Sequence, residues 1–177
     1  MCTATDTAPA LNCEALETRE NPDGNVGVAV FGNSLLIQGD DAGNHVRLER
    51  DPFGNVVITG VNSTTVNGQA AISLGPVNLQ DVTVQGAGGA DTLQVYNLAI
   101  AGTLAFAPGD ESDRVDIGNV SANVIDVSAG GGNDTVAMDN VYVASYLRVD
   151  GGADTDLLHM SNVAAPAGQV IGFEQQV

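Results

Sequence analysis

Four regularly spaced aspartates are the residues of this sequence whose types and spacing best suit chemistry. Asp91, Asp113, Asp134 and Asp156 follow one another at intervals of 22, 21 and 22 residues, and three of them close a glycine-rich turn. On adjacent turns of a repeat their carboxylates would form one row about 5 Å apart, where two unit charges repel by about 1 kcal/mol in water. Such a row requires a counter-ion, a shifted protonation state or side chains that splay outward.

Calcium is the counter-ion that these residue types favour. Ca²⁺ binds several carboxylate and backbone oxygens in flexible geometry, and glycine-rich turns bring carbonyl oxygens within reach. The sequence therefore predicts calcium ligands among the acidic residues of the repeated turns. These residues are Asp91, Asp110, Glu111, Asp113, Asp134, Asp154 and Asp156. The alternative is that Asp and Asn occur there only because they tolerate the left-handed conformation that such turns require.

The same apolar pattern follows each aspartate, which identifies an internal repeat. Large apolar residues stand two and four positions later, as Leu93 and Val95 do, and this alternation is typical of a half-buried strand. A second alternating pair, such as Leu104 and Phe106, precedes the next turn. Two strands and a turn within about 21 residues leave no room for a helix pair, so each repeat is predicted to be one coil of a parallel β-solenoid.

An asparagine follows each aspartate by six residues. We expect these side chains to face the interior at a bend, because a buried amide costs a few kcal/mol unless it is hydrogen-bonded and a stacked column of amides satisfies itself. The predicted ladder consists of Asn97, Asn119, Asn140 and Asn162.

The repeated aspartates and asparagines resemble features of two known groups of proteins. The chain resembles the right-handed parallel β-helix superfamily, whose members often have an asparagine ladder at one turn. Its Gly-Gly-x-Asp turns resemble the calcium-binding repeats of RTX (hemolysin-type) secreted proteins, which implies calcium and export. The resemblance covers roughly half of the chain. RTX proteins repeat a nonapeptide twice per short coil, whereas this sequence has one turn per longer coil and lacks the glycine between turn and aspartate, so their metal geometry does not transfer directly.

Composition limits the partners. The chain has 22 acidic residues against 5 basic ones, all arginine, and a net charge of −17, which argues against nucleic acid and anionic membranes. No apolar stretch approaches the roughly 18 residues of a membrane span, and no signal peptide is recognisable. We expect an extracellular or cell-surface location.

Cys2 and Cys13 are predicted to form a disulfide, either within the chain or between subunits.

The chain is predicted to be one all-β domain. Residues 1–25 are expected to be an N-terminal arm or cap, residues 26–85 imperfect coils or a β-meander that caps the solenoid, and residues 86–177 the regular repeats. Asn44 stands where an aspartate would, 47 residues before Asp91, a distance that suggests two coils and an excess.

The predicted function is structural: a calcium-stabilised extracellular module, not an enzyme, that self-associates through its open ends, including end to end into a filament. The alternatives are a carbohydrate-binding adhesin repeat and a polysaccharide-processing enzyme. Two outward rows of the first strands are the candidates for a glycan site, with Asp116 and Asp139 about 8 Å apart by strand geometry. The rows are Gln94, Asp116, Ala137 and His159, and Tyr96, Gly118, Asp139 and Ser161. The absence of lysine and tryptophan counts against catalysis on sugars.

Overall fold

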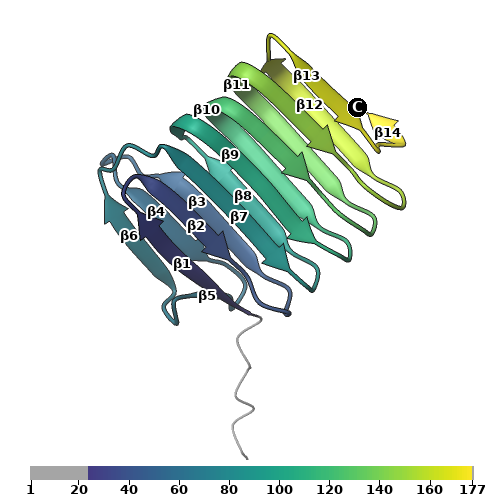
Figure 1. Cartoon of the computed structure of the whole chain (residues 1–177). Helices are drawn as coiled ribbons and strands as arrows, with labels where there is room; N and C mark the ends of the chain where they lie inside the picture. The colour runs from purple at the N-terminus through teal and green to yellow at the C-terminus, as the bar shows by residue number, and fades with distance from the viewer. Residues whose placement is uncertain (1–23, 177) are drawn as a thin grey trace, which may run out of the picture.

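The computed structural model describes residues 24–176, and its regular elements are all β-strands. Successive coils stack along one axis from the N-terminal to the C-terminal end (Figure 1). The Cys2–Cys13 disulfide and nearly all of the predicted arm lie outside the described residues. The strands are β1 (Asn25–Phe31), β2 (Ser34–Gln38), β3 (His45–Arg50), β4 (Val56–Gly60), β5 (Thr65–Val66), β6 (Ala71–Gly75), β7 (Asp81–Ala87), β8 (Thr92–Tyr96), β9 (Ala99–Gly109), β10 (Arg114–Ser128), β11 (Thr135–Asp150), β12 (Leu157–Ala164), β13 (Gly168–Ile171) and β14 (Gln175–Gln176).

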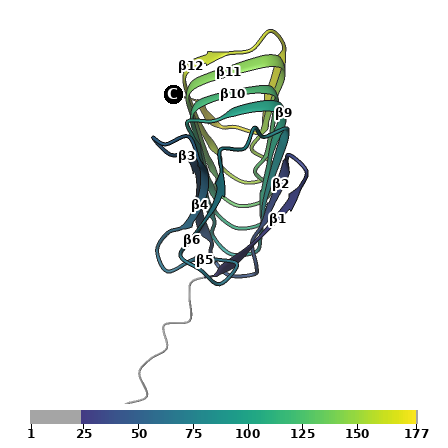
Figure 2. The same cartoon turned by 90° about the vertical axis from the view of Figure 1, so that its left-hand side faces the viewer.

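Two facing walls of strands form the solenoid (Figure 2). The wall named sheet 1 contains β3, β4, β6, β8, β12 and β14 together with the first halves of β10 and β11. The wall named sheet 2 contains β1, β2, β7, β9 and β13 together with the second halves of β10 and β11. The long strands β10 and β11 pass from one wall to the other at a bend, where their mutual register shifts between Ala122 and Val124.

The strand register confirms the repeat. Arg114 pairs with Thr92 on one side and with Thr135 on the other, and Leu157 continues the row. All of these pairings are parallel, and each places the residue after one aspartate beside the residue after the next. The predicted β-solenoid is therefore the observed fold.

The N-terminal part combines one coil with antiparallel strands. β2 and β3 pair in parallel with β7 and β8, and His45 lies opposite Thr92, so Asn44 belongs to the coil directly before Asp91. The interpretation of 47 residues as two coils is thus wrong: β4, β5 and β6 are inserted between β3 and β7, and β4 and β6 add to sheet 1 in antiparallel fashion. β1 likewise pairs antiparallel with β2. Both sheets therefore end in antiparallel strands at the N-terminal side.

The core lies between the two sheets. Its sheet 1 columns are the residues two and four after each aspartate, and Leu93, Ile117 and Met138 are among the largest fully buried side chains. Removal of apolar surface from water contributes roughly 25 cal/mol per Å², so these columns hold the coils together. Burial weakens in the last coil, where Val170 and Ile171 are 36% and 39% exposed. Within residues 24–176, no helix is long and apolar enough to cross a membrane.

Candidate functional site

The four aspartates form a column, but it lies in the interior and not at the rim where calcium ligands were expected. Their exposed fractions are between 1% and 4%. Each main-chain N–H in the column before Asp156 donates to the Oδ1 of the aspartate one coil later: Asn44 to Asp91 at 2.6 Å, Asp91 to Asp113 at 2.7 Å, and Asp113 to Asp134 at 2.8 Å. The Asp134 N–H continues the series to Asp156, also at 2.8 Å. The column therefore supplies buried N–H groups with acceptors.

The second oxygen of each aspartate is in a different situation. The Oδ2 atoms of all four are buried and have no hydrogen-bond partner among the described residues. Burial is the main cause that raises the pKa of Asp113 to about 7 and the pKa values of Asp91 and Asp134 to about 6. It also raises the pKa of Asp156. Burial therefore moves the titration of these carboxyl groups up toward neutral pH, because a buried unpaired charge is costly.

This geometry does not fit a calcium site. Asp110, Glu111 and Asp154 lie exposed on the turns, apart from the interior column. Within residues 24–176, no three His, Cys, Asp or Glu side chains converge in an arrangement that could hold a metal ion. Calcium normally takes six to eight oxygens, often including water, which a column exposed by 1–4% does not offer. Calcium binding stays a prediction from the turn sequences, without support from the described side chains.

The asparagine ladder is present, but on the outside of the bend and not in the interior. The Nδ2 of Asn119, Asn140 and Asn162 donates to the Oδ1 of the asparagine one coil earlier, at 3.2, 2.7 and 2.6 Å. All four residues have φ between 50° and 56° and are exposed. The left-handed conformation, which Asn tolerates better than most residues, turns these side chains away from the core.

A hydrogen-bonded network covers the outward side of sheet 1, here called the outer face and formed by β3, β8, β10, β11 and β12. Arg47 donates through Nε and Nη2 to the Oε1 of Gln94, at 3.2 and 3.1 Å. Gln94 donates through Nε2 to the Oδ2 of Asp116 at 3.1 Å. Arg114 closes the network with its Nε 2.9 Å from Asp116 Oδ2 and its Nη2 2.6 Å from Asp116 Oδ1.

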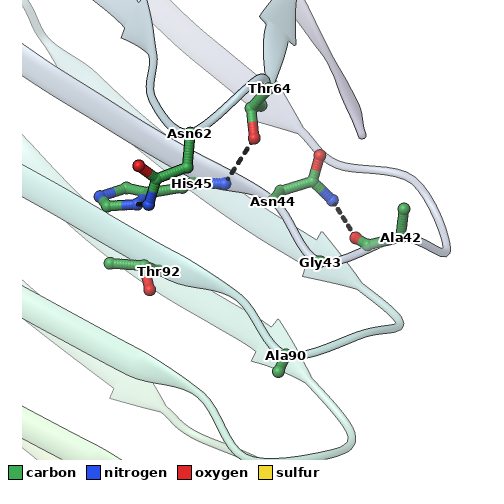
Figure 3. A pocket seen from close by; sticks show the side chains of 8 residues that line it. All are labelled: Ala42, Gly43, Asn44, His45, Asn62, Thr64, Ala90 and Thr92. Carbon is green, nitrogen blue, oxygen red and sulfur yellow. Dashed lines mark hydrogen bonds between the residues drawn. The ribbon is translucent and has the colours of Figure 1, made fainter. Parts of the chain in front are cut away.

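The network also determines which ring nitrogen of His45, at its edge, carries the proton. Since Arg47 can only donate, Gln94 Oε1 must accept, and the His45 Nε2, which lies 3.4 Å from that oxygen, carries the proton. His45 Nδ1 is then free to accept from the Asn62 amide at 2.8 Å. His45 and Asn62 border a hollow of about 400 Å³ beside the Gly–Asp turns. Asn44 also borders this hollow, and its side-chain amide donates to the carbonyl oxygen of Ala42 (Figure 3).

A second hollow of about 160 Å³ lies further along the outer face. Tyr96, Asp116, Asp139 and His159 border it. The ring of Tyr96 covers Gly118, because a Cβ on that glycine would lie only 2.8 Å from the ring atom Cδ1. The guanidinium carbon of Arg47 is 5.9 Å from the ring centroid, within the range of a cation–π contact.

The two outward rows predicted from the repeat are confirmed by the register. Gln94, Asp116, Ala137 and His159 are successive neighbours across β8, β10, β11 and β12. Sequence reasoning missed Arg47 and Arg114. Arg47 follows Asn44 by three positions, as Gln94 follows Asp91, so placing Asn44 one coil before Asp91 would have revealed Arg47.

Compared with protein-family models, with curated proteins and with solved structures, the chain shows no match.

Proposed function

We propose that this chain is a carbohydrate-binding β-solenoid module whose outer face receives a sugar ring on Tyr96. The observation that carries the proposal is the ring of Tyr96 over Gly118, within a hollow bordered by Asp116, Asp139 and His159. The half-buried ring packs on Gly118 and lies near the Arg47 guanidinium, and the part of it that stays exposed offers an apolar surface, while polar groups at its margin supply directional hydrogen bonds.

Charge balance around the ring favours a polyhydroxylated ligand over an ion. Arg47 and Arg114 lie near Tyr96 together with Asp116, so both signs of charge are present there although the whole chain has a net charge of −17. Carboxylates accept hydrogen bonds from sugar hydroxyls, and guanidinium groups donate to hydroxyl and ring oxygens. A sugar uses both kinds of group at once, whereas a simple cation or anion would be repelled by half of them.

The same contacts favour binding over hydrolysis. Asp116 Oδ2 already accepts from Gln94 and from the Nε of Arg114, and Asp116 Oδ1 forms an ion pair with the Nη2 of Arg114, so both of its oxygens face donors of the protein itself. A general acid of a glycosidase needs a carboxyl group that keeps its proton. We therefore propose a binding module without turnover, displayed outside the cell as its acidic, lysine-free composition favours.

A glycan array followed by calorimetry with the strongest ligand tests the proposal. Tyr96→Ala should abolish binding, because the apolar platform is lost. Tyr142→Ala is the matched control, since Tyr142 is 59% exposed at the bend, away from the outer face, and its loss should leave affinity unchanged. Absence of any bound glycan, or equal affinity of wild type and the Tyr96 variant, would contradict the proposal.

Self-association is a second candidate that one observation favours. Among the described residues, β13 pairs with β11 alone, and it exposes Val170 and Ile171 beside an edge of unpaired backbone groups. Such an edge accepts another strand. Sedimentation velocity should show a concentration-dependent dimer or longer assembly that Val170→Lys disrupts, and a wild-type monomer at all concentrations would count against it.

A further inference from the structure

We infer that the interior aspartate column is a hydrogen-bond ladder in which the Oδ2 atom of each aspartate lies where a hydrogen-bond donor is needed. Asparagine can therefore replace aspartate in the column, and the column does not bind calcium. This inference does not rest on the proposed sugar site. It concerns what keeps the coils in register, and it separates this chain from the calcium-ordered repeats that its turns resemble.

Asn44 provides the internal precedent. It is the column residue of the coil before Asp91, and its main-chain N–H donates to Asp91 Oδ1 as the aspartates do to one another. Its side chain carries an amide, and the Nδ2 donates to the carbonyl oxygen of Ala42, two residues earlier, at 2.6 Å. The chain itself therefore places a neutral, donor-bearing side chain at one position of the column.

The glycines beside the column show why a donor is needed. A Cβ added to Gly86 would clash with two acceptor atoms at once, the Oδ2 of Asp91 and the carbonyl oxygen of Pro108. At Gly151 the same position is close to Asp156 Oδ2 and the carbonyl oxygen of Gly172. Acceptor oxygens thus face one region without a donor between them, and these Oδ2 atoms lack a partner among the described residues.

A protonated carboxyl group or an asparagine amide would supply the missing donor between these acceptor oxygens without any further ligand. A protonated Oδ2 donates as the Asn44 amide does, and the raised pKa values of Asp91 and Asp113, about 6 and about 7, place that proton near neutral pH. An asparagine supplies the donor at every pH while its Oδ1 keeps accepting the N–H from the previous coil. Calcium would need more oxygens than the column exposes.

Thermal unfolding at pH 8 tests the inference on four proteins. Asp113→Asn should raise the Tm by roughly 2–4 °C, since it replaces a buried ionisable group by an amide that satisfies the same contacts. Asp154→Asn is the matched control, because it removes the same charge from an exposed turn residue with φ 81°, which Asn tolerates, and its Tm should stay close to that of the wild type. Asp134→Asn repeats the substitution one coil later and should behave as Asp113→Asn does.

The response of the Tm to calcium distinguishes a hydrogen-bond ladder from a calcium site. Addition of millimolar calcium chloride, or of a chelator, should leave the relative order of the four Tm values unchanged. A calcium-dependent rise in the wild-type Tm that is absent in Asp113→Asn would overturn the inference. A Tm of both column variants below that of the wild type at pH 8, or failure of both to fold, would overturn it as well.

Discussion

The main-chain N–H of Asp91 donates to the Oδ1 of Asp113, 2.7 Å away and one coil further along the chain. The same contact recurs along the whole column, so each aspartate caps a buried donor of its predecessor. Buried donors without acceptors cost about 1–3 kcal/mol each. The aspartates therefore join adjacent coils through the backbone, at the point where the chain leaves one glycine-rich turn and begins the next strand.

Loss of one column acceptor should destabilise the fold. Asp113→Ala leaves the Asp91 N–H buried without its partner, and we expect the free energy of unfolding to fall by about 1–3 kcal/mol. Urea denaturation at pH 6 measures this change. Asp110→Ala, in the exposed part of a turn, is the control and should change stability by much less.

Acidification should stabilise the protein. The folded pKa values of Asp91 and Asp113, about 6 and about 7, lie above the ordinary value of 3.8, so the folded state binds more protons than the unfolded state between these limits. The resulting stability is complete below the unfolded pKa and is lost as the pH rises through 6 to 7. The Tm should therefore rise by several degrees from pH 8 to pH 5.

Repulsion between surface carboxylates would act in the same direction, so a control is needed. Asp40, Glu111, Asp150, Asp154 and Glu174 all lie near enough to the column to raise its pKa values. Asp113→Asn should flatten the pH profile more than Asp154→Asn does, although both remove one charge. Equal flattening by the two variants would assign the effect to the surface.

The asparagine ladder should depend on conformation as much as on hydrogen bonding. Asn119 has φ 53°, accepts from Asn140 and donates to Asn97. Asn119→Val should destabilise by about 2 kcal/mol or more, because a β-branched side chain is strained in this region and the ladder is broken. Asn119→Gly, which relieves the strain, should cost clearly less in urea denaturation. Similar losses for both variants would show that conformation is not the deciding factor.

Gly118 should control the orientation of the Tyr96 ring. A Cβ at this position would lie 2.8 Å from Tyr96 Cδ1, so Gly118→Ala should displace the ring while the backbone stays in place. We expect weaker glycan binding, by about tenfold, with a Tm within a few degrees of the wild type. Unchanged affinity would show that the ring position does not determine binding.

Gly86 should tolerate substitution least. A Cβ there would collide with Asp91 Oδ2 and with the Pro108 carbonyl oxygen of the next coil. Gly86→Ala should lower the Tm markedly, because one of the obstacles is backbone. Gly54→Ala is a useful comparison: that glycine has φ 88° but open space around it, so its variant carries conformational strain alone, whereas the Gly86 variant carries the collision.

The repeat period was enough to predict the coil and its register. Apolar pairs at fixed distances from each aspartate place Leu93, Val115 and Val136 in one buried row, and the structure confirms it. The period does not reveal the insertion of β4 to β6, since 47 residues suit two coils as well as one interrupted coil.

The faces of the two polar columns were assigned the wrong way round. Strand alternation contains part of the answer: Asp91 has the same parity as the buried Leu93 and Val95, which places it inside. Asn97 shares that parity, but Leu98 directly after it is buried, so the alternation must shift there. That shift is produced by the positive φ of the asparagine, which a residue pattern alone does not show.

The carboxyl ¹³C chemical shifts of the column aspartates, followed through a pH titration, test the central claim most directly. If these side chains lie in the interior ladder, Asp113 should titrate near pH 7, and Asp91 and Asp134 near pH 6. Midpoints at about 3.9 for all of them, the ordinary value of an exposed aspartate, would contradict the interior column.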